Sequence, residues 1–235
     1  MVVGNHWSDV EVMTSHDSLG AAWLHALGHV LTHGRPVRDG PEELVEVLNL
    51  VLAIRSVSFD PLLRRYADPA RIELMRRKYR SLEVLPPYPM SYGALLYDHD
   101  GVDQVQWVVD RIRRKPETKS ATITFHRPGA SELSCVSLLD FKLRDGRVVM
   151  TAVYRSQNVF ASQPGNVLAL SEVHERVARD LGVRPGAFVL HVLSAHVYAK
   201  DVPSAKLILK IADQEFRGHR ANSELPSLEL QHRGG

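Results

Sequence analysis

The side chains best suited to chemistry lie between Cys135 and Tyr198. Cys135 is the only cysteine in the chain, and a thiolate is a strong nucleophile. The pair Arg155-Ser156, then Asn166, then the pair His196-x-Tyr198 follow it in that order. A nucleophile, a cation beside a hydroxyl, a single amide and a His/Tyr pair are together what a site needs to hold a nucleoside monophosphate and attack its base.

Taken singly, each of these residues has an ordinary structural explanation. A lone cysteine in a strand such as 133–138 is usually a buried core residue. Arg155-Ser156 would be a solvated strand end, and His196 and Tyr198, two apart on a strand, would form a satisfied polar pair on one face. The combination, rather than any one residue, indicates a functional site.

The helices expected to frame this site are recognised by periodicity and by their first residues. Ser18 is a suitable N-cap for the first, and Asp68 followed by Pro69 is a strong start for the second. The predicted helices span residues 18–31, 69–80, 101–113 and 167–181. The connecting segments comprise a turn at 33–40, an Arg-bearing loop at 59–65 and a rigid proline connector at 86–89.

Runs rich in Val, Leu and Ile predict the strands. They span residues 121–125, 133–143, 147–154, 187–198 and 207–211. Asp145-Gly146 between two of them is a strong hairpin signal. Residues 43–54 could form a helix, but the alternation of Glu46 and Asn49 with apolar residues favours a half-buried strand. The fold class is therefore α+β, with a mostly antiparallel sheet and long packed helices.

Composition restricts the class of protein. The chain has 235 residues, 44% apolar and 24% charged, with a formal net charge of +2. These values are typical of one globular domain and point to neither a nucleic acid polymer nor a membrane as partner. One cysteine excludes an internal disulfide and a Cys-rich metal site. With no signal peptide and no membrane-length apolar run, we expect a cytoplasmic protein whose domain spans 1–216, followed by a loosely held tail at 217–235.

The order of these motifs resembles the thymidylate synthase family. That family has a catalytic cysteine before an Arg-Ser-x-Asp-x-Phe run, then Pro-x-Asn, a long helix and a His-x-Tyr strand end. The matching stretches here are Cys135, Arg155-Ser156-Gln157-Asn158-Val159-Phe160, Pro164-Gly165-Asn166 and His196-Val197-Tyr198. The likeness extends over about 18–212 and is strongest in 135–198. It implies a thymidylate synthase-like fold and a homodimer formed through the sheet, with composite sites.

The resemblance also implies roles on the nucleotide. Cys135 would add to C6 of a pyrimidine, making C5 a nucleophile toward the one-carbon unit of 5,10-methylenetetrahydrofolate. Arg155 would bind the phosphate and favour the thiolate, joined at the phosphate by Ser156 and Arg38. Lys119, where the family has an arginine pair, would reach the phosphate in the partner subunit.

Further roles follow from the same likeness. Asn166 would read the base edge, while His196 and Tyr198 would hold the ribose. Tyr92 resembles the family's Tyr-Gly tyrosine, and Asn158 stands where the family has an aspartate that contacts folate. The family's catalytic glutamate would be Glu46 if residues 43–54 formed a helix, and Glu73 if they form a strand. The strand interpretation favours Glu73. If Glu73 has no catalytic role, it would be a surface carboxylate paired with Arg76 or Arg77.

Departures from the family bear on the product. Val136 replaces the usual His and Tyr154 the usual Gln, and Lys119 is followed by Ser120 instead of a second arginine. Where synthases carry tryptophans that shield the exocyclic methylene from water, residues 75–80 are short and basic. Without that shield, water would give a hydroxymethyl pyrimidine, which predicts a CMP or dCMP hydroxymethylase. The alternatives are a divergent thymidylate synthase acting on dUMP and a nucleotide-binding relative without activity.

Overall fold

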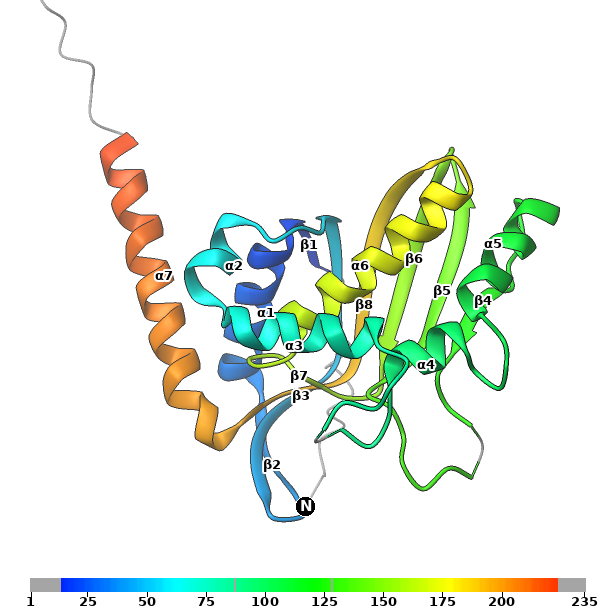
Figure 1. Ribbon diagram of the computed structural model, residues 1–235. Helices are drawn as coiled ribbons and strands as arrows, with labels where there is room; N and C mark the ends of the chain where they lie inside the picture. Colours follow the sequence, from blue (N-terminus) through cyan, green and yellow to red (C-terminus); the bar gives the residue numbers. More distant parts are fainter. Residues whose placement is uncertain (1–13, 87, 128, 224–235) are drawn as a thin grey trace, which may run out of the picture.

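The computed structural model describes residues 14–86, 88–127 and 129–223. Its centre is a mixed sheet in the order β1-β3-β8-β6-β5-β4, with β2 also paired to β3 and β7 to β8 (Figure 1). The strands are β1 (Thr14–Ser18), β2 (Arg35–Asp39), β3 (Glu42–Ser56), β4 (Ala121–Thr124), β5 (Val136–Arg144), β6 (Arg147–Tyr154), β7 (Gln157–Asn158) and β8 (Arg184–Tyr198).

The strand directions agree with the predicted class. The pairs β2–β3, β3–β8, β4–β5 and β5–β6 are antiparallel, and the pairs β1–β3, β6–β8 and β7–β8 are parallel. Residues 43–54 lie in a strand, as favoured. Leu50, Leu52 and Ile54 alternate as buried residues there, and this period of two is what a strand with one face on the core requires.

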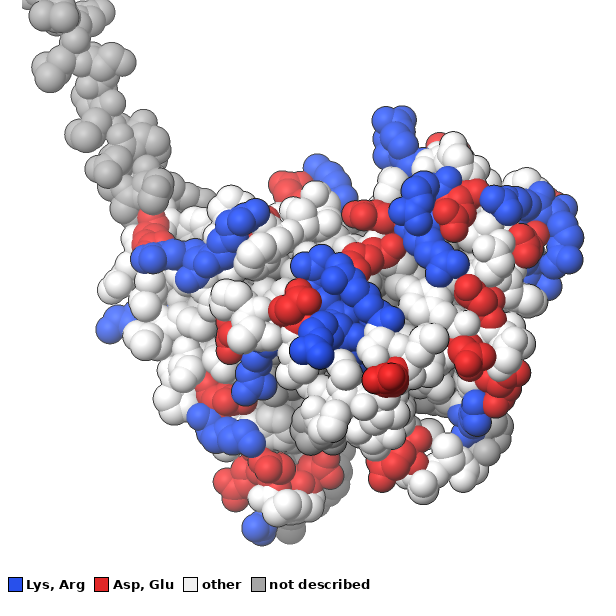
Figure 2. Space-filling model, in the orientation of Figure 1, with Lys and Arg blue, Asp and Glu red and all other residues white. Residues whose placement is uncertain are grey.

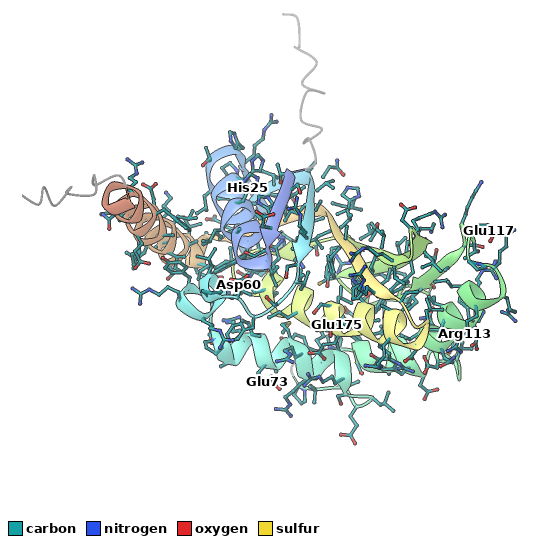
Figure 3. All side chains as sticks on the ribbon, turned by 90° about the horizontal axis from the view of Figure 1, so that it is seen from above. His25, Asp60, Glu73, Arg113, Glu117 and Glu175 are labelled. Carbon is teal, nitrogen blue, oxygen red and sulfur yellow. The ribbon has the colours of Figure 1, made fainter. Side chains whose placement is uncertain are left out.

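The helices lie on one face of the sheet. They are α1 (Leu19–His33), α2 (Pro61–Tyr66), α3 (Pro69–Arg80), α4 (Tyr92–Tyr97), α5 (Gln104–Arg114), α6 (Gln163–Asp180) and α7 (Val202–Ser223), with a short 3-10 turn at Ala199–Asp201. In Figures 1 and 3, α3 and α6 cross this face. Their contact is close enough that a Cβ on Gly165 would lie 2.7 Å from the Met75 Cβ, so only glycine fits at that point.

The other face of the central strands is half-buried or exposed. No helix in the described part of the chain covers it, as the view from above shows (Figure 3). We call it the uncovered face; its apolar residues are Val51, Ala53, Leu138, Val149, Val153, Val189 and Leu193. No helix among the described residues has both the length and the apolar content to cross a membrane.

Three predicted segments differ from the structure. The turn expected at 33–40 contains β2, which pairs with β3 in an antiparallel hairpin. The loop expected at 59–65 contains α2, because Asp60 caps it and Pro61 begins it. The prediction of a strand at 207–211 is wrong, because these residues belong to α7. The residues of α7 that face the core are Ala205, Ile208, Leu209 and Ala212. That spacing of three and four is helical, and the apolar run at 207–211 concealed it.

Element ends differ as well. Helix α6 begins at Gln163, four residues earlier than predicted, and α4 was not predicted. Strand β5 begins at Val136, so Cys135 lies just before the strand and not within it. The domain limit expected at 216 falls inside α7, while residues 224–235 of the expected tail lie outside the described residues.

Asp60 joins two helices and provides a test of the packing. Its carboxylate accepts N–H bonds from Leu62 and Leu63 at 2.9 and 3.1 Å and from Gly20 of α1 at 2.7 Å. Asp60 is buried, and its place beside α1 is visible in Figure 3. We expect Asp60→Ala to lower the free energy of unfolding by about 2–3 kcal/mol, because three N–H donors lose their acceptor and the bonds from Gly20 and Leu63 are buried.

Asp68→Ala is the matched control in urea denaturation. Asp68 also precedes a proline and caps a helix, but its bonds to Ala70 and Arg71 are exposed and it does not reach α1. A loss of about 1 kcal/mol is expected for that variant. Equal losses in the two variants would contradict the bridging role of Asp60.

Candidate active site

Cys135 is fixed through its backbone at the end of the sheet where β6 and β8 finish. Its N–H donates to the Tyr92 hydroxyl at 3.0 Å, and its carbonyl accepts the Arg155 N–H at 2.8 Å. The residue is partly exposed. The thiol therefore occupies a defined position that a ligand can reach.

A tyrosine cluster (Tyr79, Tyr88, Tyr92 and Tyr154) surrounds this position. The Tyr79 and Tyr154 hydroxyls lie 2.7 Å apart, and the Tyr79 and Tyr92 rings meet edge to face at 4.9 Å. Burial raises the pKa of all four hydroxyls, and a negative charge on Cys135 would raise the pKa of each further. The cluster is therefore a set of neutral hydroxyls close to the sulfur atom.

Lys78 reaches the same place from α3. Its ammonium lies 3.7 Å from the Tyr88 ring centroid and 3.9 Å from that of Tyr92. Only 7% of Lys78 is exposed, and burial lowers the pKa of its ammonium to about 8, with the charge of Cys135 acting in the opposite direction. Sequence reasoning missed this residue, because it stands in a run of basic residues that resembles a solvated helix face.

Arg155 holds the chain that carries Cys135. Its Nε donates to the Ser134 carbonyl at 3.0 Å and its Nη2 to the Leu133 carbonyl at 2.9 Å. Its Nη1 lies 3.5 Å from the Ser156 hydroxyl. The predicted Arg-Ser pair is thus adjacent to the thiol, with one edge of the guanidinium directed toward Ser156.

Buried polar atoms without a partner lie where β7, β8 and the start of α6 meet. Within the described residues these are Gln157 Nε2, Gln163 Oε1, Asn166 Oδ1 and His196 Nδ1. Gln163 donates to Gln157 at 3.1 Å, which leaves one atom of each amide unpaired. An unsatisfied buried group costs about 1–3 kcal/mol, so a polar ligand at this junction would be stabilised. Asn166 and His196 were predicted; Gln157 and Gln163 were not.

His196 and Tyr198 face the same side of β8, as expected, with ring centroids 5.2 Å apart. Burial lowers the pKa of His196, and the Ser194 backbone, Glu46 and Asp39 act against that shift. Burial raises the pKa of Tyr198, and a charge on Cys135 would raise it further. Both side chains are therefore neutral hydrogen-bonding groups, and Tyr198 is close enough to Cys135 to be affected by its charge.

Several predicted residues lie elsewhere or are already engaged. Glu73 is on the outer side of α3, 3.8 Å from Arg76 and directed away from the sheet (Figure 3). Asn158 accepts the Ala161 N–H at 3.0 Å and so closes a turn. Arg38 lies on the β2–β3 hairpin, which extends beyond the sheet at the same end as Cys135 (Figure 1).

Lys119 lies at the opposite end of the strands from Cys135. Ala121 of β4 pairs with Phe141 of β5, so Lys119 is more than about 20 Å from Cys135 at roughly 3.3 Å per residue. One subunit therefore does not bring this lysine to its own thiol. Glu46, the alternative glutamate, accepts the Ser194 hydroxyl at 2.5 Å and pairs with His196 across β3 and β8.

Comparisons with known proteins give one consistent result. Residues 13–233 match the family described as thymidylate synthase. A "Putative thymidylate synthase" of Methanothermobacter marburgensis is 31% identical over 220 residues, covering 83% of this chain and 97% of that protein. One from Methanosarcina mazei is 31% identical over 203 residues, covering 82% and 92%. The "Thymidylate synthase" of Mycoplasma pneumoniae is 29% identical over 122 residues, covering 50% and 42%.

The Tyr79–Tyr154 hydroxyl pair predicts a measurable coupling. We expect Tyr79→Phe or Tyr154→Phe alone to lower the unfolding free energy by about 1–3 kcal/mol, because each leaves a buried hydroxyl unpaired. The double variant should lose clearly less than the sum of the two. Urea denaturation of the four proteins measures this cycle, and additive losses would show that the two hydroxyls do not depend on each other.

Proposed function

Because the chain belongs to the thymidylate synthase family, we propose that it transfers a one-carbon unit to C5 of CMP or dCMP and releases the hydroxymethyl nucleotide. Members of the family are one-carbon transferases that use methylenetetrahydrofolate as co-substrate. The observation that carries the proposed product is the polar surrounding of Cys135, which consists of tyrosine hydroxyls and a lysine ammonium.

The proposed chemistry begins at Cys135. Its sulfur bonds to C6 of the pyrimidine, and the electron pair of the C5–C6 double bond moves so that C5 becomes nucleophilic. Methylenetetrahydrofolate supplies a carbon at the oxidation level of formaldehyde. After C5 has bonded to that carbon and lost its proton, the bond from the carbon to the folate nitrogen breaks and tetrahydrofolate leaves, which gives an exocyclic methylene at C5. Water adds to that methylene and supplies the hydroxyl group, and departure of the sulfur from C6 restores the ring double bond.

The nucleotide would be held by the polar residues that the sequence predicted for this role. Arg155 and Ser156 are adjacent and face one another, which suits a phosphate. The unpaired amide oxygen of Asn166 is buried next to the junction of β7 and β8 and suits a donor on the base edge. His196 and Tyr198 then remain for the ribose hydroxyl.

The product depends on whether water or hydride reaches the exocyclic carbon. A thymidylate synthase must exclude water there. Among the described residues, the side chains around Cys135 include no tryptophan. The indole N–H of Trp23 donates a hydrogen bond to the Val159 carbonyl, and the ring of Trp107 packs against Arg111 on α5. Hydroxyls and an ammonium bind water readily, so the polar surrounding supports hydrolysis to the hydroxymethyl product.

A second candidate is methylation of dUMP. The relatives from Methanothermobacter marburgensis and Methanosarcina mazei, which cover most of this chain, carry the name "Putative thymidylate synthase", and this favours the methylation reaction. The amide of Asn166 can pair with uracil or, turned over, with cytosine, so that residue does not decide the base.

We further propose a homodimer formed through the uncovered face. Seven apolar side chains on that face are half-buried or exposed, and no helix of the described residues covers them. An apolar face of this kind normally meets a partner. A second copy across the face would also give Lys119 a role, because this lysine is remote from the thiol of its own subunit.

The product assay separates the candidates. Incubating the protein with methylenetetrahydrofolate and CMP, dCMP or dUMP labelled with tritium at C5 should release tritium and give a hydroxymethyl product from a cytosine nucleotide. Cys135→Ser should retain nucleotide binding and lose release by more than about a thousandfold. Thymidylate and dihydrofolate from dUMP would favour the second candidate. Binding with no release from any substrate would identify an inactive relative.

Subunit mixing tests the composite site. When Cys135→Ser and Lys119→Met subunits, each inactive alone, are unfolded and refolded together, about a quarter of wild-type sites should recover if each lysine serves the partner's site. Mixing Cys135→Ser with Asn166→Ala is the matched control and should recover nothing, since both residues belong to the same subunit's site. No recovery in either mixture would contradict the role of Lys119.

A further inference from the structure

Lys78 differs from the other basic residues of α3. Arg76 and Arg80 form ion pairs with Glu172 at 2.7 and 2.8 Å, and Arg71 and Arg77 are exposed. Positive side chains gather over the middle of this face of the molecule, where α3 lies (Figure 2). Lys78 instead turns inward and is 7% exposed. Among these basic residues of α3, Lys78 is therefore the one that is neither exposed to solvent nor paired with a carboxylate.

The ammonium of Lys78 makes no hydrogen bond or ion pair with the described residues. It lies over the faces of Tyr88 and Tyr92, at 3.7 and 3.9 Å. Such contacts are worth about 2 kcal/mol when desolvated, whereas burying a charge without an anion is far more unfavourable. A buried cation that lacks an anion implies that an anion is supplied in the functional state.

Cys135 is positioned to be that anion. The ring of Tyr92 contacts Lys78, and its hydroxyl accepts the Cys135 N–H at 3.0 Å. The charges of Lys78 and Cys135 are near enough to act on each other, and Cys135 is the titratable group whose charge favours the Lys78 ammonium. The same tyrosine thus aligns both partners.

Arg155 is less suited to this task. Its Nε and Nη2 already donate to the Ser134 and Leu133 carbonyls, and the residue is exposed. Water screens an exposed charge strongly. Its remaining edge faces Ser156, where it can bind phosphate.

We propose that Lys78 is the cation that holds Cys135 as a thiolate before the nucleotide binds. The thiol proton leaves to solvent, the ammonium keeps its three protons, and the pair is neutral overall. This inference deepens the proposed function, since the thiolate is the form that adds to C6. Among the described residues, the titratable groups around the pair are five tyrosine hydroxyls, Arg155, and His126, whose Nε2 lies 3.0 Å from the Ser134 carbonyl. The tyrosines are Tyr79, Tyr88, Tyr92, Tyr154 and Tyr198.

Alkylation by iodoacetamide tests the pair without nucleotide or folate. Since the chain has one cysteine, all alkylation reports on Cys135. Lys78→Met retains the length of the side chain and removes its charge. We expect its alkylation rate at pH 7 to be at least about tenfold below wild type, because the thiolate loses a neighbouring opposite charge. Lys78→Arg should retain most of the rate.

Lys115→Met is the control, because it removes one positive charge at the exposed end of α5; its rate should equal that of wild type. A second measurement needs no variant at Lys78: the ultraviolet absorbance of wild type minus that of Cys135→Ser, followed against pH, shows the thiolate directly. An unchanged rate in Lys78→Met, or no thiolate absorbance in wild type at pH 7, would overturn the proposal. Normal alkylation with no tritium release from C5 would instead reject the proposed function and leave the ion pair standing.

Discussion

The position of Cys135 depends on one hydrogen bond between distant parts of the chain. Its backbone N–H meets the hydroxyl of Tyr92, 43 residues earlier in the sequence, and this contact joins α4 to the start of β5. Because burial raises the pKa of Tyr92, its hydroxyl stays neutral and remains an acceptor for that N–H. Without this contact, the segment before β5 would be held by Arg155 and His126 at the Leu133 and Ser134 carbonyls, and the backbone N–H of Cys135 would lose its link to the tyrosine that contacts Lys78.

Two close backbone approaches make that geometry possible. A Cβ on Gly93 would lie 2.1 Å from the Ser81 carbonyl oxygen, and one on Gly165 would lie 2.7 Å from the Met75 Cβ. Glycine at both positions lets the end of α3 approach α4 and lets its middle approach α6. Helix α3 can therefore present Lys78 and Tyr79 to the interior while its arginines remain outside.

The buried polar groups form two neighbouring sets with different consequences. The tyrosine cluster is internally paired in part, and it rigidifies the surroundings of the thiol. At the junction of β7, β8 and α6, four polar atoms of the described residues are left unpaired. Preformed unpaired groups destabilise the free protein, and a ligand that forms hydrogen bonds with them restores this stability. This arrangement is expected of a ligand site.

The sequence alone determined most local structure and the order of the chemical groups. Capping residues such as Ser18 and Asp68 act within one turn of helix, and Asp145-Gly146 acts within one hairpin, so these predictions needed no distant contact. Family resemblance likewise identified Cys135 and the Arg155-Ser156 pair, which the structure brings together. Only the tertiary structure decided that α7 is a helix, that Glu73 faces outward and that Lys78 faces inward. Each of these depends on which side of an element packs against distant residues, and burial of that kind is set by the whole fold and not by the neighbours in sequence.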